Sequence, residues 1–130
     1  MLKYEKLIAI FIKEFPEVVN DYKEVIRSLE WEINQNLVYS FYESVVRVVF
    51  LDLVKNSSSS DFNEALLLKL LSFFEKMALS DDLEVKNALS IAIFEYITDD
   101  ITILCKIAEM LKQNSKKIFE YSMNISYYNK

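Results

Sequence analysis

The chain has 130 residues and a net charge of −5, and it contains no glycine, no histidine, one proline and one cysteine. Average usage would supply roughly nine glycines, so tight glycine turns, phosphate-cradling loops and glycine-rich nucleotide-binding folds are excluded. The lack of histidine removes the commonest general base and metal ligand, which excludes Ser–His and Cys–His catalysis.

This length suits one domain, and a hydrophobic content of 52% argues against disorder. The best candidate for a leader, Leu7 to Ile12, is too short for a signal peptide or a membrane span. The single cysteine, Cys105, cannot form an internal disulfide, and its apolar surroundings at Ile101–Ile107 predict a buried side chain. These observations predict a cytoplasmic protein without a membrane partner.

Three helices are expected in the first half of the chain. The first covers Leu2–Glu14, and Pro16 opens the second because proline is tolerated in a first helical turn. Leu37–Val54 contains a β-branched run that also suits a strand, but its length and an i,i+4 charge pair favour a helix. The aromatic residues Tyr39, Phe41 and Tyr42 on this helix are predicted to lie in the core.

The second half repeats one pattern. Asp61 with Glu64, and Asp81 with Glu84, both have the form of a capping box, and they lie twenty residues apart. Asp99–Asp100 opens a third helix after a similar interval. We therefore predict an all-α, single-domain antiparallel array of about six helices over residues 1–122, in which HEAT-like hairpin stacking is one arrangement. Residues 123–130 are expected to form a frayed or docked tail.

Acidic residues are concentrated in residues 75–100, where seven acids face two lysines. The acids are Glu75, Asp81, Asp82, Glu84, Glu95, Asp99 and Asp100. Helix capping, an acidic surface for a partner and a metal site are the three interpretations. Capping is favoured, and it is compatible with partner binding. The spacing does not match a calcium loop, whose sharp turn needs a glycine, so no metal and no cofactor is predicted.

Glu95 lies in the segment 88–97, which is apolar nearly all round, so a buried carboxylate is the hypothesis there. A catalytic pair of Glu75 with Glu95 is disfavoured, because the sequence supplies no polar groups that would position a substrate. No catalytic residue is therefore assigned. Direct nucleic-acid binding is not expected either, because it needs clustered basic residues; an acidic surface favours a basic protein partner.

The segment Leu71–Asp100 resembles small all-helical bacterial immunity proteins, which are encoded beside polymorphic or contact-dependent toxins. It reads LSFFEKMALSDDLEVKNALSIAIFEYITDD, two apolar helices, each with a glutamate, around a Ser-Asp-Asp turn. The resemblance implies a cytoplasmic, non-catalytic protein that binds and neutralises a cognate toxin. It carries over no binding residue.

The sequence thus predicts an immunity protein that meets a basic toxin domain through Asp81, Asp82, Glu84, Asp99 and Asp100. Because the turns at 79–84 and 98–100 flank the helix Leu83–Ile97, they are expected at its opposite ends, as two patches or one long stripe. The alternative is a helical adaptor that binds a peptide or helix in an apolar groove. A homodimer through an apolar face is left open.

Overall fold

Helices form all regular structure in residues 1–29 and 37–128, the part of the chain that this computed structural model describes. The all-α prediction is confirmed. In chain order the elements are the 3-10 turn η1 (Tyr4–Lys6), α1 (Leu7–Glu14), α2 (Pro16–Asp21), α3 (Lys23–Leu29), α4 (Leu37–Phe41), the π-helix η3 (Tyr42–Val46), α5 (Arg47–Lys55), α6 (Glu64–Ala78), α7 (Leu83–Asn87), the π-helix η4 (Ala88–Phe94), α8 (Ile101–Met110) and α9 (Gln113–Tyr128).

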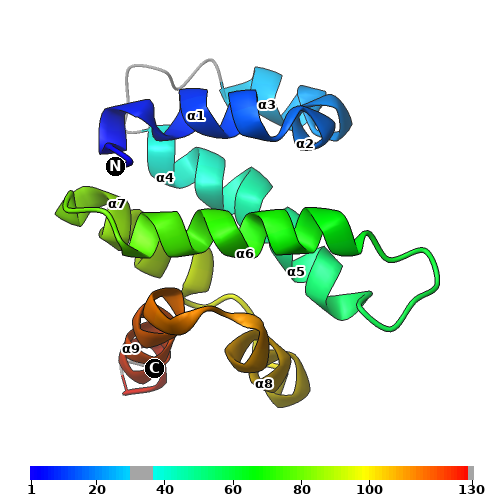
Figure 1. The fold of residues 1–130 in the computed structure, drawn as a ribbon, viewed down its shortest axis with the longest axis vertical. Helices are drawn as coiled ribbons and strands as arrows, with labels where there is room; N and C mark the ends of the chain where they lie inside the picture. The colour runs from blue at the N-terminus through cyan, green and yellow to red at the C-terminus, as the bar shows by residue number, and fades with distance from the viewer. Residues whose placement is uncertain (30–36, 129–130) are drawn as a thin grey trace.

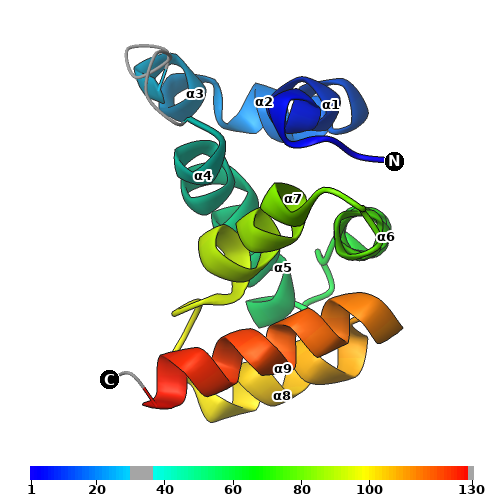
Figure 2. The same cartoon turned by 90° about the vertical axis from the view of Figure 1, so that its left-hand side faces the viewer.

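The helices are arranged in three tiers along the longest axis of the molecule (Figure 1). The helices α1, α2 and α3 lie at one end and the pair α8 and α9 at the other. Between them are α6 and the consecutive segments α4–η3–α5 and α7–η4. The first of these segments contacts α1 and α3 at one end and α8 at the other, while α6 and η4 contact α9. Figure 2 shows α8 and α9 running side by side along one edge.

Aromatic rings hold the tiers together. Phe11 stacks on Phe15, and both rings meet Phe73 of α6 edge to face. A second series runs from Phe50 through Phe74 and Phe94 to Phe119, with centroid distances of 4.9, 5.9 and 5.3 Å. Each such pair contributes about 0.5–1.5 kcal/mol beyond the area it buries. One continuous core therefore joins the first helix to the last.

The predicted helix at 37–54 is present as three consecutive segments, α4, η3 and α5, that reach Lys55. Three of its valines, Val45, Val46 and Val49, are buried in the core, so tertiary packing outweighs the strand propensity of this run. Phe41 and Tyr42 lie in the core as predicted, while Tyr39 is only partly buried. The Tyr42 hydroxyl donates a 2.8 Å hydrogen bond to the Leu7 carbonyl, and burial raises the pKa of Tyr42 well above its usual value.

Pro16 takes the first position of α2, as predicted, and α1 ends at Glu14 before it. The Lys69 ammonium from α6 donates to the exposed Glu14 carbonyl and lies 4.6 Å from the centre of the Phe15 ring. This break between α1 and α2 is therefore satisfied from another helix.

The capping residues differ from those expected in two of three places. Asn63, not Asp61, caps α6 by accepting from the Leu66 N–H, and Asp82, not Asp81, caps α7 by accepting from the Glu84 N–H. Asp100 caps α8 as predicted. In both cases the prediction names the first acidic residue of the run, whereas the residue directly before the first helical turn makes the bond.

The second half of the chain does not form the three helices of similar length that the repeated pattern predicts. The π-helix η4 ends at Phe94, and Tyr96 then has a φ of 57°, which is uncommon for a residue other than glycine. The last predicted helix is split at Leu111 into α8 and α9, and α9 continues past the expected boundary at 122 to Tyr128. Met123 packs against the core. The expectation for residues 129–130 lies outside the described residues.

The side chain of Cys105 is exposed, so the prediction that it is buried is wrong. The buried face of α8 is formed by Ile103 and Ile107, one turn apart, and Cys105 projects between them toward the opposite side. No described helix has the length and apolar character that crossing a membrane requires.

Candidate functional site

The acids at the turn before α7 are engaged within the protein. Asp81 forms a 2.8 Å ion pair with Lys3, whose hydrogen bond and charge lower the pKa of Asp81. One oxygen of Asp82 caps α7, and the other accepts from the Tyr4 N–H at 2.9 Å. The buried Ser80 hydroxyl donates to the Leu2 carbonyl at 2.6 Å. This turn therefore fastens the N-terminal segment, and of the three predicted acids there only Glu84 is simply exposed.

The acids at 99–100 lie beyond the far end of η4, so the structure does not bring them together with Asp81 and Asp82. The helical stretch between the two turns, Leu83 to Phe94, spans roughly 18 Å at 1.5 Å per residue. Asp100 accepts from the N–H groups of Thr102 and Ile103 as the cap of α8. The five predicted binding residues therefore do not form a single patch.

Glu95 is only partly buried, so the hypothesis of a buried carboxylate is wrong. The π-helix η4 ends one residue earlier, at Phe94, and Glu95 itself has extended backbone angles. The backbone carbonyl of Glu95 accepts a hydrogen bond from the Arg47 guanidinium at 3.2 Å. Arg47 also pairs with Glu43 at 3.3 Å, the i,i+4 pair expected from the sequence.

Glu75 has a structural role and not the catalytic role that was weighed, and disfavoured, in the sequence analysis. Its carboxylate, on α6, accepts from the backbone N–H groups of Asn114 and Ser115 and from the Asn114 side chain, at 3.2, 2.8 and 2.8 Å. It thus closes the N-terminus of α9 from a neighbouring helix. Partial burial raises the pKa of Glu75, but the hydrogen bonds from Asn114 and Ser115 together outweigh it and leave the pKa lowered.

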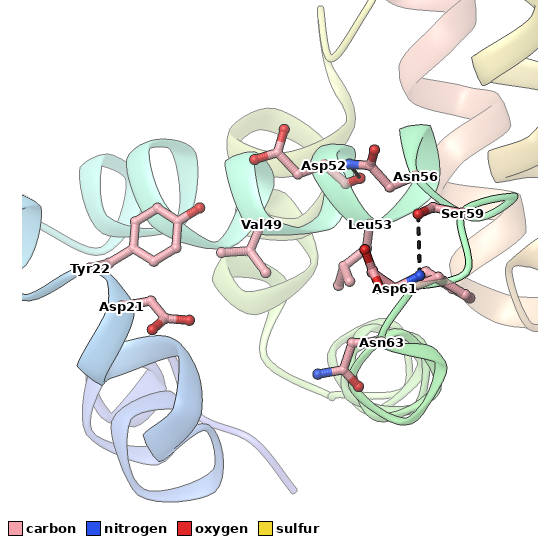
Figure 3. A pocket seen from close by; sticks show the side chains of 10 residues that line it. Asp21, Tyr22, Val49, Asp52, Leu53, Asn56, Ser59, Asp61 and Asn63 are labelled. Atoms are coloured by element: carbon pink, nitrogen blue, oxygen red, sulfur yellow. Dashed lines mark hydrogen bonds between the residues drawn. The ribbon is translucent and has the colours of Figure 1, made fainter.

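A pocket of about 430 Å³ lies at the other end of α6, between the α2–α3 junction, α5 and the loop that precedes α6 (Figure 3). It is lined by Asp21, Tyr22, Val49, Asp52, Leu53, Asn56, Ser59, Asp61, Phe62 and Asn63. The α5 residues recur at spacings of three and four, which places them on one face of that helix. Val49 and Leu53 form an apolar floor, while Asp21 and Tyr22 face the loop across the opening.

The pocket is negatively charged. Its lining includes Asp21, Asp52 and Asp61 but no lysine or arginine. Within the described residues, no cation forms an ion pair with any of these three carboxylates. Burial, and then the charges of Asp52 and Asp21, raise the pKa of Tyr22, so the phenol stays protonated beside them.

The other polar groups of the pocket shape its wall. The Asn56 amide donates to the Asp52 carbonyl at 2.8 Å, and the Ser59 hydroxyl accepts from the Asp61 N–H at 3.2 Å. The side chain of Asn63 caps α6. These bonds hold the backbone of the loop, and the carboxylates of all three aspartates are exposed.

Such a pocket suits an organic cation. Its volume falls within the range of ligand pockets, and an alkyl chain that ends in a charged nitrogen would meet both the apolar floor and the carboxylates. Among the described residues, no group of three His, Cys, Asp or Glu side chains is placed to hold a metal ion.

Sequence reasoning missed these three aspartates because they are spread over forty-one positions and three elements. In the residues 1–60 the bases nearly balance the acids, so the charge pattern there is inconspicuous. The available signal was the position of each aspartate near the end of a helix, next to an aromatic or apolar residue: Asp21-Tyr22, Asp52-Leu53 and Asp61-Phe62.

A family model described as Domain of unknown function (DUF7674) matches residues 8–128. The matched region includes every residue that lines the acidic pocket. No curated protein and no solved structure matches the chain.

Proposed function

We propose that this chain, which belongs to the DUF7674 family, is a non-catalytic, cytoplasmic protein-binding protein that neutralises a cognate bacterial toxin. Its acidic pocket, and not the turns at 79–84 and 98–100, receives a basic side chain of the toxin domain. The resemblance of Leu71–Asp100 to immunity proteins is the reason for proposing a toxin as the partner. The acidic pocket is the proposed binding site.

The observation that carries the proposal is that Asp21, Asp52 and Asp61 all line one hollow, while no cation of the described residues forms an ion pair with them. Unbalanced like charges cost stability in the free protein, and a bound basic group would offset their repulsion. A lysine or arginine side chain would place its charge among the carboxylates and its methylene groups on Val49 and Leu53.

This chemistry suits toxins that act on nucleic acids, because their active sites carry basic residues that bind phosphate. A rigid helical surface with a negative pocket would occupy such residues and block the substrate. Complementary charge would also speed the encounter between the two proteins and make it sensitive to salt.

The experiment has two stages. The gene is expected directly beside a large toxin gene, and that toxin domain is then titrated against the wild type and against the triple variant Asp21→Asn, Asp52→Asn, Asp61→Asn. The wild type is expected to bind at one-to-one stoichiometry and to restore growth of cells that express the toxin. The triple variant is expected to lose at least tenfold in affinity, and the loss should shrink at high salt.

The matched control is the double variant Glu84→Gln, Asp99→Asn, which removes charge from the surface that the sequence favoured. It is expected to bind and protect as the wild type does. Full protection by the triple variant together with loss in this control would overturn the assignment of the pocket. The absence of any neighbouring toxin gene would count against the toxin itself.

The second candidate function is a helical adaptor. A specific observation favours it, an apolar hollow of about 560 Å³ at the opposite end of α6. An adaptor would bind its partner there, and its binding would be insensitive to the triple variant of the pocket.

A further inference from the structure

The hollow at the C-terminal end of α6 lies between the N-terminal segment, α1, the last turn of α6 and Leu79, the residue that follows it. Its apolar lining consists of Met1, Leu2, Ile10 and Leu79, and its charged lining of Lys13, Glu14 and Lys76. Met1 and Leu79 are 83% and 53% exposed, which is a large apolar exposure for one small region.

The charge of this hollow is opposite to that of the chain. Two lysines and one glutamate line it, in a protein with a net charge of −5. Glu14 lies 3.8 Å from Lys76, whereas Lys13 forms no ion pair within the described residues. The hollow therefore fits an apolar group that carries an acid beside it.

Such a group lies on the same end of the molecule. Leu83, the first residue of α7, is 67% exposed, and the exposed Glu84 follows it. Only the turn at 80–82 separates Leu83 from Leu79, which lines the hollow. Asp81 and Asp82 are already held by Lys3 and by Tyr4, so Glu84 is the acid available to a partner.

We propose that this end of the molecule is the interface of a symmetric homodimer, in which Leu83 of each copy enters the hollow of the other and Glu84 faces Lys13. A twofold axis requires one patch to be complementary to itself, and a projecting leucine with an acid next to a hollow with a lysine meets that requirement. Complementary shape and charge within one face favour a second copy over an unrelated peptide.

The dimer would leave the acidic pocket open. Asn63 lines that pocket at one end of α6 and Leu79 lines the hollow at the other, and the helix between them is roughly 22 Å long. The two copies would therefore carry two accessible pockets. The proposal stands on residues outside the pocket and does not depend on the function proposed for it.

The test is the mass of the purified full chain, measured by sedimentation equilibrium over an about hundredfold range of concentration. The wild type is expected to be a dimer that dissociates on dilution. Leu83→Glu should be a monomer throughout, because a buried carboxylate would replace the leucine in an apolar hollow. The control Leu68→Glu, at a 55% exposed leucine in the middle of α6, should dimerise as the wild type does.

A charge exchange sharpens the test. Glu84→Lys is expected to weaken the dimer by about tenfold, and Lys13→Glu in the same chain should restore most of the loss. A wild type that stays monomeric at the highest concentration would overturn the proposal and leave the hollow to a different partner. Equal effects of Leu83→Glu and Leu68→Glu, or no rescue by the double variant, would also overturn it.

Discussion

The two ends of α6 use their acidic residues in opposite ways. At the C-terminal end, Asp81 and Asp82 are bound to Lys3, to Tyr4 and to the first turn of α7. At the N-terminal end, Asp21, Asp52 and Asp61 line a pocket, and none of them pairs with a cation in the part of the chain that the structure describes. Asp81 and Asp82, adjacent in the sequence, stabilise the turn before α7, whereas Asp21, Asp52 and Asp61 come from three separate elements and are exposed.

The difference arises from local geometry. Adjacent acids before a helix reach the N–H groups of its first turn at little cost, so capping takes them first. Acids that come from three separate elements have no common helix end to cap. They meet only because α2, α5 and the loop before α6 converge, and the repulsion among them has to be offset by packing elsewhere or by a ligand.

The largest expected effect is on the structural side of this comparison. Asp82→Ala removes both the cap of α7 and the acceptor for the Tyr4 N–H, and we expect a loss of about 1–2 kcal/mol in the free energy of unfolding. At roughly 4 °C for each kcal/mol, thermal unfolding monitored by circular dichroism would detect it. Asp82→Asn, which keeps an acceptor, should lose less. Equal melting of Asp82→Ala and the wild type would show that this turn does not fasten the N-terminal segment.

The next effect concerns Glu75, a third acid with a structural task. Its folded-state pKa is lowered, so its contribution to stability is complete above the ordinary carboxyl value of 4.5 and is lost as the pH falls through the lowered value. Glu75→Gln should therefore be less stable than the wild type at pH 7, and the difference should shrink between about pH 5 and pH 3. Urea unfolding of the two proteins at pH 7, pH 5 and pH 3 measures this difference in the free energy of unfolding. A difference that is independent of pH would mean that the charge of Glu75 is not involved.

On the other side of the comparison, replacing the pocket acids should not weaken the fold. The triple variant Asp21→Asn, Asp52→Asn, Asp61→Asn is expected to have a free energy of unfolding within about 0.5 kcal/mol of the wild-type value, or slightly above it. The reason is that these substitutions remove charge repulsion but no capping hydrogen bond. The same urea experiment at low and high salt checks this. A loss of stability as large as that of Asp82→Ala would show that these aspartates are structural. The acids at the two ends of α6 would then not differ in role.

The smallest effect is on the Tyr22 phenol. Burial is the main cause of its raised pKa, and the charges of Asp52 and Asp21 add to it. In the double variant Asp21→Asn, Asp52→Asn the pKa of Tyr22 should fall but stay above its ordinary value of 10.0. NMR titration with carbon-13 labelled tyrosine rings follows this one residue among eight. An unchanged pKa would place the two carboxylates too far away to define one site.

Much of the fold can be predicted from the sequence because its signals are local. Pro16, the serine loop at 57–60 and Asp100 each mark a helix boundary through their own backbone or side-chain chemistry. The break between α8 and α9 has no such signal, since neither glycine nor proline occurs there. It is stabilised by Glu75, thirty-nine positions earlier than Asn114, and a contact at that separation leaves no local pattern.

The candidate site was less predictable for the same reason. Of the acids at 75–100, Asp82 and Asp100 cap helices and Glu75 binds the first turn of α9. The prediction that Glu95 is buried is wrong because η4, which packs on η3, ends one residue before it. Charge that gathers in space, such as that of Asp21 and Asp61, is visible only once α2 and the loop before α6 are placed.

The central claim is that the pocket at the N-terminal end of α6, and not the acidic turns, binds basic groups. The most direct test is an NMR titration of the labelled wild type with tetralysine, a cationic probe that is drawn to every acidic region. We expect the backbone shifts to change most at 21–22 and 49–63, to vanish in the triple asparagine variant and to weaken at high salt. Shifts concentrated at 81–84 and 99–100, and retained in the triple variant, would contradict the claim.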